Sequence, residues 1–183
     1  ELKKVVSVKD FIVNKSNGLF KVQDNTVLVD DMPVIGEVAD RILSFMKEDL
    51  DCEPLVHFVR KVRNNPDERA VRDLFSFLDK NKHPITKTGN FIAYKRVLAP
   101  DENGTMLDIH SRTMDNRPGT ILEMPRAAVD SDPNRTCSAG LHVANWNYAQ
   151  QFYGDGVMLE VEVDPADVVA IPVDYNQAKM RTC

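Results

Sequence analysis

Residues 136–152 read TCSAGLHVANWNYAQQF, and this stretch decides how the second half of the chain folds. Its LHVA segment is short and apolar, and Gly140 before it lets the backbone turn out of a loop rich in Pro, Asp, Ser and Asn. The NWNYAQQF segment that follows has the pattern of a helix of about two turns. We therefore expect a buried strand and then a short helix, which bring a cysteine, a histidine and the single tryptophan close together.

Strand patterns lie on both sides of this stretch. The segments NFIAYKRVL (residues 90–98) and TMLDIH (residues 105–110) are separated by the turn sequence Asp-Glu-Asn-Gly, and together they predict a β-hairpin. The segment VMLEVEV (residues 157–163) follows a Gly-Asp-Gly turn and reads as a further strand. The C-terminal half is therefore expected to be mainly antiparallel.

The N-terminal half changes from strand to helical periodicity at Pro33. Residues 5–31 alternate short apolar stretches with Asn, Gly and Asp, as strands joined by tight turns such as Ser16-Asn17-Gly18 do. After Pro33, apolar residues recur at intervals of three and four, which is the spacing of one face of a helix.

The third helix has the clearest start signal in the chain. It lies at NPDE (residues 65–68), where Asn65 can cap the first amides of the helix and the proline suits the first turn. The helix should end before Pro84, because a residue that precedes proline is pushed out of the helical region. Its buried stripe is expected at Ala70, Val71, Leu74, Phe75 and Leu78.

Together these patterns predict an α+β protein. We expect a small N-terminal strand unit at residues 1–32 and a helical segment of about three helices at residues 33–83. A mainly antiparallel β C-terminal domain with one short helix should follow at residues 84–183.

Composition excludes several classes of protein. The chain has 183 residues, 28% of them charged, and no apolar run approaches the ~18 residues that a transmembrane helix needs. Its three cysteines have no CxxC spacing, which argues against a disulfide framework and a zinc site. Lysines gather in the first half but alternate with acidic residues, so we expect no nucleic-acid partner.

Polar and aromatic residues near the predicted strand ends form a candidate pocket. No catalytic residue can be assigned, and because no HxH or HxxxH spacing occurs we expect neither a metal nor a cofactor. The same residues also fit three structural interpretations. Residues 110–112 would be a solvated strand end, and Glu160 and Glu162 would lie on the solvent-exposed face of a strand. The helix face that carries Trp146, Ala149, Gln150 and Tyr153 would pack onto the sheet. The candidate residues are His110, Ser111, Arg112, His142, Trp146, Tyr148, Glu160 and Glu162.

Two residues of the opening stretch have specific expectations. His142 alternates with Leu141 and Val143, so if these two are buried its imidazole should face a cleft and titrate near neutrality. Cys137 lacks a catalytic signature and is expected to be a small buried thiol that reacts slowly.

Four long segments resemble the RIIB-type proteins of tailed bacteriophages. They read NNPDERAVRDLFSFLDKNKHPIT, PITKTGNFIAYKRV, DNRPGTILEMPRAAVDSDPNRTCSAGLHVANWNYA and DVVAIPVDYNQAKMRTC. This resemblance covers roughly residues 30–183. It implies a phage accessory protein in the cytoplasm of the infected bacterium, free or peripheral to the inner membrane. The implied role is in lysis inhibition, the superinfection response and prophage exclusion.

The resemblance implies protein interaction rather than catalysis. The implied partners are a RIIA-like phage protein or host envelope and defence proteins, and the family supplies no established catalytic residue. We therefore expect a protein that is not an enzyme.

A shorter pattern is similar to part of ADP-ribosyltransferase-like domains. It comprises GLHVA (residues 140–144), a helix containing Tyr148, and the strand VMLEVEV. This resemblance would place Glu160 or Glu162 at the catalytic glutamate and His110 near the first motif position. It leaves open the alternative of an NAD- or nucleotide-binding protein or enzyme.

Overall fold

The structure is a computed structural model, and it describes residues 18–23, 26–34, 36–81, 83–152 and 154–183. Its contacts group the chain into two compact units: Glu1–Asn64 with Ile85–Asn90, and Asn65–Pro84 with Phe91–Cys183. The boundaries predicted at residues 32 and 83 do not coincide with the limits of these units. The three-part division therefore stays a prediction. Tyr153 and the apolar stretches at residues 5–13 lie outside the described residues.

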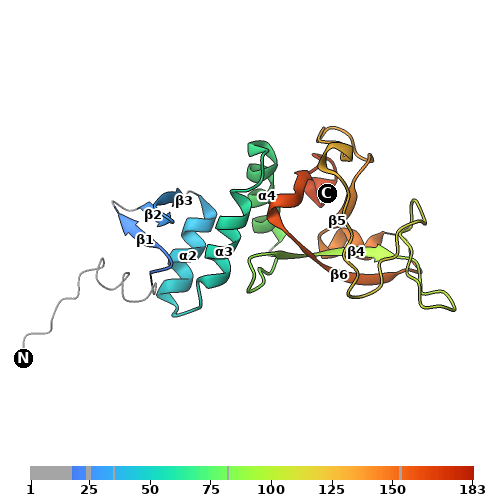
Figure 1. The fold of residues 1–183 in the computed structure, drawn as a ribbon, viewed down its shortest axis with the longest axis horizontal. Coiled ribbons are helices and arrows are strands. Elements are labelled where there is room, and N and C mark those ends of the chain that lie inside the picture. Colours follow the sequence, from blue (N-terminus) through green and yellow to red (C-terminus); the bar gives the residue numbers. More distant parts are fainter. Residues whose placement is uncertain (1–17, 24–25, 35, 82, 153) are drawn as a thin grey trace, which may run out of the picture. The chain divides into compact units, whose positions relative to one another are not determined.

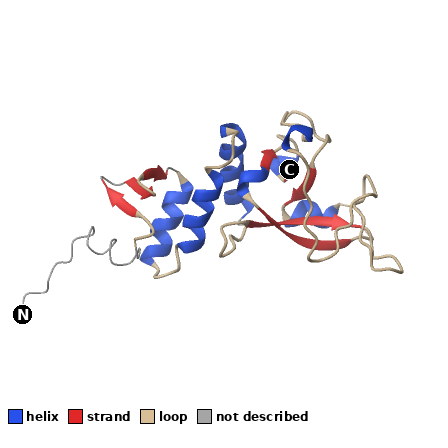
Figure 2. Ribbon diagram, in the orientation of Figure 1, coloured by secondary structure: helices blue, strands red, loops and turns tan. Residues whose placement is uncertain are grey.

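In its described residues, the first unit combines a small antiparallel sheet with two helices (Figures 1 and 2). Strands β1 (Lys21–Gln23), β2 (Thr26–Val29) and β3 (Met32–Val34) form the sheet in that order. Helices α2 (Glu37–Lys47) and α3 (Glu53–Val62) follow. The helical pattern was expected to begin at Pro33, but this residue lies in β3, an edge strand, where proline is tolerated.

The turn between β2 and β3 is held by a side chain of α3. Asp30 and Asp31 have φ values of 52° and 60°, as both central residues of a type I′ hairpin turn require. The Arg60 guanidinium donates two hydrogen bonds to the Asp30 carboxylate, at 2.8 and 2.7 Å. This bidentate pair joins the turn to the helix within the first unit.

The second unit is built on a five-stranded sheet in the order β6-β4-β5-β8-β7, with every neighbouring pair antiparallel. Helix α4 (Glu68–Asn81) lies against β7, and helix α5 (Trp146–Gln151) lies against β4 and β5. Three 3-10 turns lie in the connections: η1 (Arg126–Ala128), η2 (Pro165–Asp167) and η3 (Tyr175–Gln177). The strands are β4 (Phe91–Val97), β5 (Leu141–Ala144), β6 (Val157–Val163), β7 (Val168–Ala170) and β8 (Lys179–Thr182).

The predicted hairpin of residues 90–98 with residues 105–110 is confirmed only at its turn end. Strand β4 pairs along all seven of its residues with β6, whereas residues 105–110 meet it through an isolated antiparallel bridge between Asp108 and Val97 and a 2.9 Å hydrogen bond from the Leu98 amide to the Leu107 carbonyl. The Asp108 carboxylate accepts hydrogen bonds from Ser111, Thr113 and Met114. These bonds close a local turn, which competes with strand pairing.

The predicted fold class, α+β, is confirmed. The described residues form four helices and two antiparallel sheets, with three and five strands. Within the described part of the chain, no helix is long and apolar enough to cross a membrane.

Candidate functional site

The predicted strand and short helix of the opening stretch are confirmed as β5 and α5. Asn145 caps α5, because its side-chain oxygen accepts a 2.8 Å hydrogen bond from the Tyr148 amide. Within the helix only Ala149 is buried, and Asn147 and Gln151 lie on the exposed side. The helix therefore presents most of its surface outward.

Trp146 lies on one flank of α5 and is only partly covered. Its ring meets Tyr94 of β4 edge to face at 5.1 Å between centroids, but 47% of the residue remains exposed. The expectation that Trp146, Ala149 and Gln150 pack onto the sheet is confirmed for Ala149 and in part for Trp146, whose ring contacts β4, but it is wrong for Gln150, which is exposed. A helix of six residues buries only the narrow stripe centred on Ala149.

Tyr148 lies on the opposite flank, in a cluster with residues that follow β7. Its ring is 5.3 Å from that of Tyr175, and the Lys179 ammonium lies 5.8 and 5.0 Å from the two ring centroids. Lys179 is 5% exposed and also lies 3.5 Å from the Asp174 carboxylate. Burial raises the pKa of Tyr148, and Tyr175, Cys137 and Asp174 add to the shift. The lysine therefore holds its two rings by cation–π contact.

The loop that carries Tyr175 has an unusual backbone. Tyr175, Asn176 and Gln177 are consecutive non-glycine residues with φ values of 46°, 56° and 57°. Each left-handed residue of this kind costs on the order of 1 kcal/mol, so the surrounding structure must hold the loop. Gln177 accepts a 2.7 Å hydrogen bond from Lys80, and the Val173 amide donates one of 3.1 Å to Pro133.

Together α5 and this loop form what we call the uncharged aromatic surface. Its two most exposed large hydrophobic side chains are Tyr175 at 61% and Val173 at 59%. Every exposed side chain that belongs to it is uncharged, although 28% of the whole chain is charged. The members are Trp146, Asn147, Gln150, Gln151, Val173, Tyr175 and Asn176.

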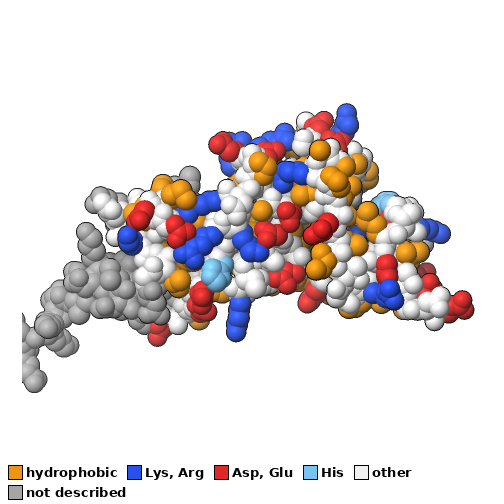
Figure 3. Space-filling view, in the orientation of Figure 1, with side chains coloured by type: hydrophobic (Ala, Val, Ile, Leu, Met, Phe, Trp, Pro, Cys, Tyr) orange, Lys and Arg blue, Asp and Glu red, His pale blue; other side chains and the backbone are white. Residues whose placement is uncertain are grey.

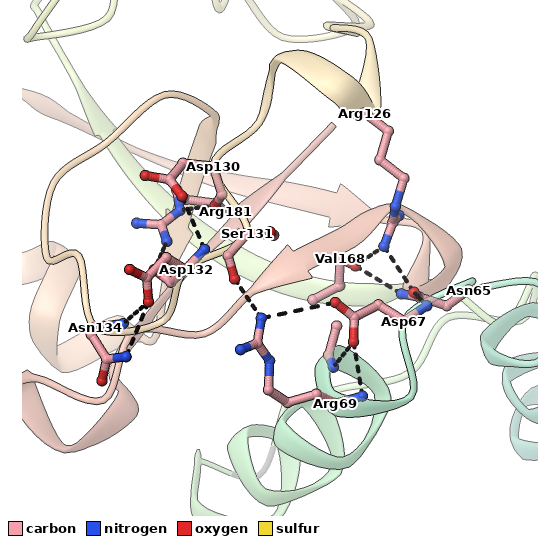
Figure 4. Close-up of polar contacts among 11 residues, drawn as sticks. Asn65, Asp67, Arg69, Arg126, Asp130, Ser131, Asp132, Asn134, Val168 and Arg181 are labelled. Atoms are coloured by element: carbon pink, nitrogen blue, oxygen red, sulfur yellow. Dashed lines mark hydrogen bonds and ion pairs between the residues drawn. The ribbon is translucent and has the colours of Figure 1, made fainter.

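A buried arginine fixes the long loop that supports Val173. The Arg181 side chain is 0% exposed and donates to the carbonyl oxygens of Asp130, Asp132 and Arg135 at 2.8, 2.6 and 2.7 Å. Figure 4 shows Arg181 between Asp130 and Asp132. Gly140, at φ 149°, lies so close that an added Cβ would meet the Arg181 side chain and Val129 at 3.0 Å. This packing positions the loop and, through Pro133, the uncharged aromatic surface.

The Asp130 carboxylate forms hydrogen bonds with other residues of the same loop. It accepts hydrogen bonds from Ser138, from the Asp132 amide and from Arg135, and these bonds lower its pKa to about 2, with the Ser138 bond contributing most. The acidic stretch AAVDSDPN is therefore an ordered support whose charges are engaged locally.

The candidate residues His110, Ser111 and Arg112 lie in the turn after Asp108. The His110 ring is 5.6 Å from that of Phe152, which stacks on Tyr148 at 5.9 Å. Ser111 donates to Asp108, and Arg112 has a left-handed backbone with φ 56°. His110 thus joins the outer end of the aromatic cluster.

The pKa of His142 does not lie near neutrality, where it was expected. Leu141 and Val143 are buried as expected, and His142 lies directly opposite Arg181 in the β5–β8 ladder. Burial lowers its pKa to about 4, helped by the positive charges of Arg181 and Lys179. The expectation of a histidine that titrates near neutrality is therefore wrong.

The lowered pKa of His142 predicts how the stability of the folded chain depends on pH. The pKa of His142 falls from 6.5 to about 4 on folding, so between these pH values the unfolded chain binds a proton that the folded chain does not. Stability should decrease as the pH is lowered through this window and level off below it. In urea melts, the free energy of unfolding should fall less for His142→Gln than for the parent as the pH is lowered through this window, by on the order of 2 kcal/mol.

The matched control for this prediction is His110→Gln, which makes the same replacement at an exposed histidine outside the β5–β8 ladder. Identical pH profiles for His142→Gln and the parent would show that His142 does not carry the effect.

The glutamates of β6 lie apart from His142. Both Glu160 and Glu162 are exposed, and Glu160 pairs with Tyr94, which pairs in turn with Ala144. Two strand spacings of about 4.8 Å separate Glu160 from Ala144 by roughly 10 Å. No contact among described residues joins His110, His142 and Glu160, so the enzyme alternative stays a prediction.

Cys137 is exposed, and the expectation of a buried thiol is wrong. The residue lies in the loop before Gly140, near enough to Tyr148 to influence the pKa of its hydroxyl. Burial instead raises the pKa of Cys52, which is the buried thiol of the chain. Slow reaction with thiol reagents is therefore expected of Cys52 and no longer of Cys137.

No metal centre stands out among the described residues, and no basic surface stands out on the face drawn in Figure 3. Within the described ranges, no three His, Cys, Asp or Glu residues gather as metal ligands would. On the face drawn in Figure 3, acidic and basic side chains are interspersed over the described surface. The absence of a nucleic-acid partner stays a prediction.

Comparison with known proteins shows to which family the chain belongs. The family model described as bacteriophage T4 protein rIIB matches residues 20–183. The chain belongs to this rIIB family. A curated relative, protein rIIB of Enterobacteria phage T4, is 36% identical over 179 residues, which are 97% of this chain and 56% of the relative. The chain thus spans little more than half the length of that relative. No solved structure matches.

Several functional candidates of this rIIB-family chain were missed by reasoning from sequence. Tyr175, Lys179 and Arg181 all lie in the segment DYNQAKMRTC, which contributed only to the family resemblance. Its one local signal was the concentration of Tyr, Asn and Gln at residues 175–177, which is typical of an ordered loop and carries no information about Lys179 and Arg181 in β8.

Proposed function

We propose that this chain takes the RIIB-type part in lysis inhibition, the superinfection response and prophage exclusion in the infected bacterium, and that it acts by binding another protein. The partner we propose is a RIIA-like phage protein. Membership of the rIIB family supports the first part of this proposal. The uncharged aromatic surface supports the second.

The composition of that surface is the observation that carries the proposal. Cores of protein interfaces are enriched in Tyr and Trp and depleted of Lys, Glu and Asp. Trp146 and Tyr175 lie exposed on either flank of α5, with Asn147 and Gln151 between them on its outer side. Large side chains with few rotatable bonds bind at a low cost in conformational entropy.

The surface is also held in place before binding. Asn145 caps α5, Lys179 lies over both tyrosine rings, and Lys80 holds the left-handed loop through Gln177. A surface that is already ordered loses less conformational entropy when a partner docks. This arrangement supports binding by docking of preformed surfaces.

The test places charge in the surface without removing a packed side chain. Phage that carry Asn147→Arg together with Gln151→Arg should lose lysis inhibition and lyse early after superinfection, because a partner would have to bury two unpaired charges. The matched control is Asn103→Arg, in an exposed turn elsewhere in the same unit. It should lyse at the parental time.

Thermal melts of the purified variants establish that each still folds. Normal lysis inhibition by the folded double variant would contradict the proposal.

A further inference from the structure

Strand β6 forms one edge of the larger sheet, and its features differ from those of the opposite edge. It is seven residues long, whereas β7 at the other edge has three residues and lies against α4. Long edge strands are uncommon, because their outward backbone groups invite pairing with another chain. The length of β6 therefore calls for an explanation.

The outer side of β6 is available for pairing over most of its length. Strand β4 is the ladder partner of β6 among the described residues, and no other described backbone group bonds to the stretch 157–161. Alternate residues of an edge strand direct their N–H and C=O groups away from the sheet. These groups can accept an added strand.

The side chains of β6 carry charge of one sign on one face. Glu160 and Glu162 alternate along the strand and are exposed, while Leu159 and Val161 on the other face are half-buried. Opposite charges on neighbouring strands stabilise a pair, and like charges directly opposite destabilise it. A strand that adds here should therefore carry basic residues at alternate positions.

The same rule argues against pairing with a second copy. In an antiparallel pair of two β6 strands centred on the middle residue, Glu160 would lie opposite Glu160 of the other copy. Like-charge repulsion at the centre would disfavour that arrangement. A basic partner meets no such repulsion.

We propose that the outer edge of β6 binds an extended segment of a partner protein, with Lys or Arg at every second residue, as a sixth strand of the sheet. Backbone hydrogen bonds supply attachment, and the negative charge of the strand face centred on Glu160 selects the basic side chains. This site lies on a different element from the uncharged aromatic surface and does not depend on the proposed role in lysis. It goes beyond that proposed function.

The test uses designed peptides and the full chain. A fluorescent peptide of about nine alternating threonine and lysine residues should bind at least about tenfold more tightly, by fluorescence anisotropy, than its threonine–glutamate counterpart. A lysine peptide with a central proline should bind at least about tenfold more weakly, because proline cannot donate to the ladder. Salt near 0.1 M limits long-range attraction.

Charge reversal supplies the matched protein variants. Glu160→Lys should weaken binding of the lysine peptide about fivefold or more and strengthen binding of the glutamate peptide. Glu102→Lys, at an exposed turn of the same unit, should leave both affinities at the parental values.

Three outcomes would overturn the proposal. If the proline-interrupted peptide binds as tightly as the uninterrupted lysine peptide, binding depends on charge attraction alone and not on strand pairing. An equal loss of affinity in Glu102→Lys would show that the lysine peptide binds elsewhere on the surface. If the lysine peptide does not bind at all, the glutamates of β6 would serve only to protect the edge against aggregation.

Discussion

Replacing Arg181 by methionine should lower the free energy of unfolding by about 3–5 kcal/mol. The guanidinium is fully buried and donates to three backbone carbonyls of the loop 130–135. Methionine fills a similar volume but leaves those three oxygens without the donors that the guanidinium supplies. Urea denaturation followed by circular dichroism measures the change.

Arg135→Met is the matched control for this prediction. The Arg135 side chain is 67% exposed and pairs with Asp130 and Asp132 at the surface. Exposed ion pairs contribute little, so its loss should stay below about 1 kcal/mol. A similarly small loss in Arg181→Met would show that the loop does not depend on the buried guanidinium.

Asn65→Ala should cost about 2–4 kcal/mol, more than the ~1 kcal/mol of a lost helix cap. The Asn65 amide donates to the carbonyls of Pro165 and Val168 at 3.0 and 2.8 Å, and its oxygen accepts a 2.9 Å bond from Arg126 (Figure 4). From the sequence, Asn65 was expected to cap the third helix. Its oxygen accepts a 3.0 Å hydrogen bond from the Asp67 amide, but this amide precedes the helix, which begins at Glu68, so the assignment of the cap is wrong.

The cap of α4 is Asp67, whose carboxylate accepts from the amides of Arg69 and Ala70. Asp67→Ala should therefore cost about 1 kcal/mol and provides the comparison. Asn65→Asp keeps the acceptor oxygen but loses the donor, so its loss should approach that of the alanine variant. If Asn65→Ala costs no more than Asp67→Ala, the amide bonds to Pro165 and Val168 contribute little.

Helical and short strand patterns could be read from local sequence because burial follows local periodicity. In the third helix Ala70, Leu74 and Leu78 are buried as predicted. Phe77 is buried in place of Phe75, because it stacks on His83, which lies beyond the end of the helix. That partner is fixed by tertiary structure, which the helical spacing does not contain.

Strand pairing could not be read in the same way. The turn sequence at residues 101–104 predicted a local partner for β4, but β6 pairs with it across some 60 intervening residues. Gly156 contributes to this pairing, since an added Cβ would lie 2.3 Å from the Val97 oxygen. A local turn signal does not report which distant strand matches in length and register.

The uncharged aromatic surface depends on contacts between distant segments. Trp146 and Tyr148 were candidates from the sequence, but Tyr175 and Lys179 join them only because β8 pairs with β5. The buried role of Arg181 was equally hidden, because an arginine in a polar stretch reads as exposed. Pairing across the sheet, rather than any short motif, assembles this surface.

Hydrogen–deuterium exchange tests the proposed interaction most directly. The chain would be compared alone and in the complex recovered from infected cells, with the Asn147→Arg and Gln151→Arg double variant as the reference that should not form the complex. We expect exchange to slow at residues 146–151 and 173–177 in the complex. Unchanged exchange in both segments, with slowing elsewhere in the chain, would contradict the assignment of the uncharged aromatic surface as the binding site.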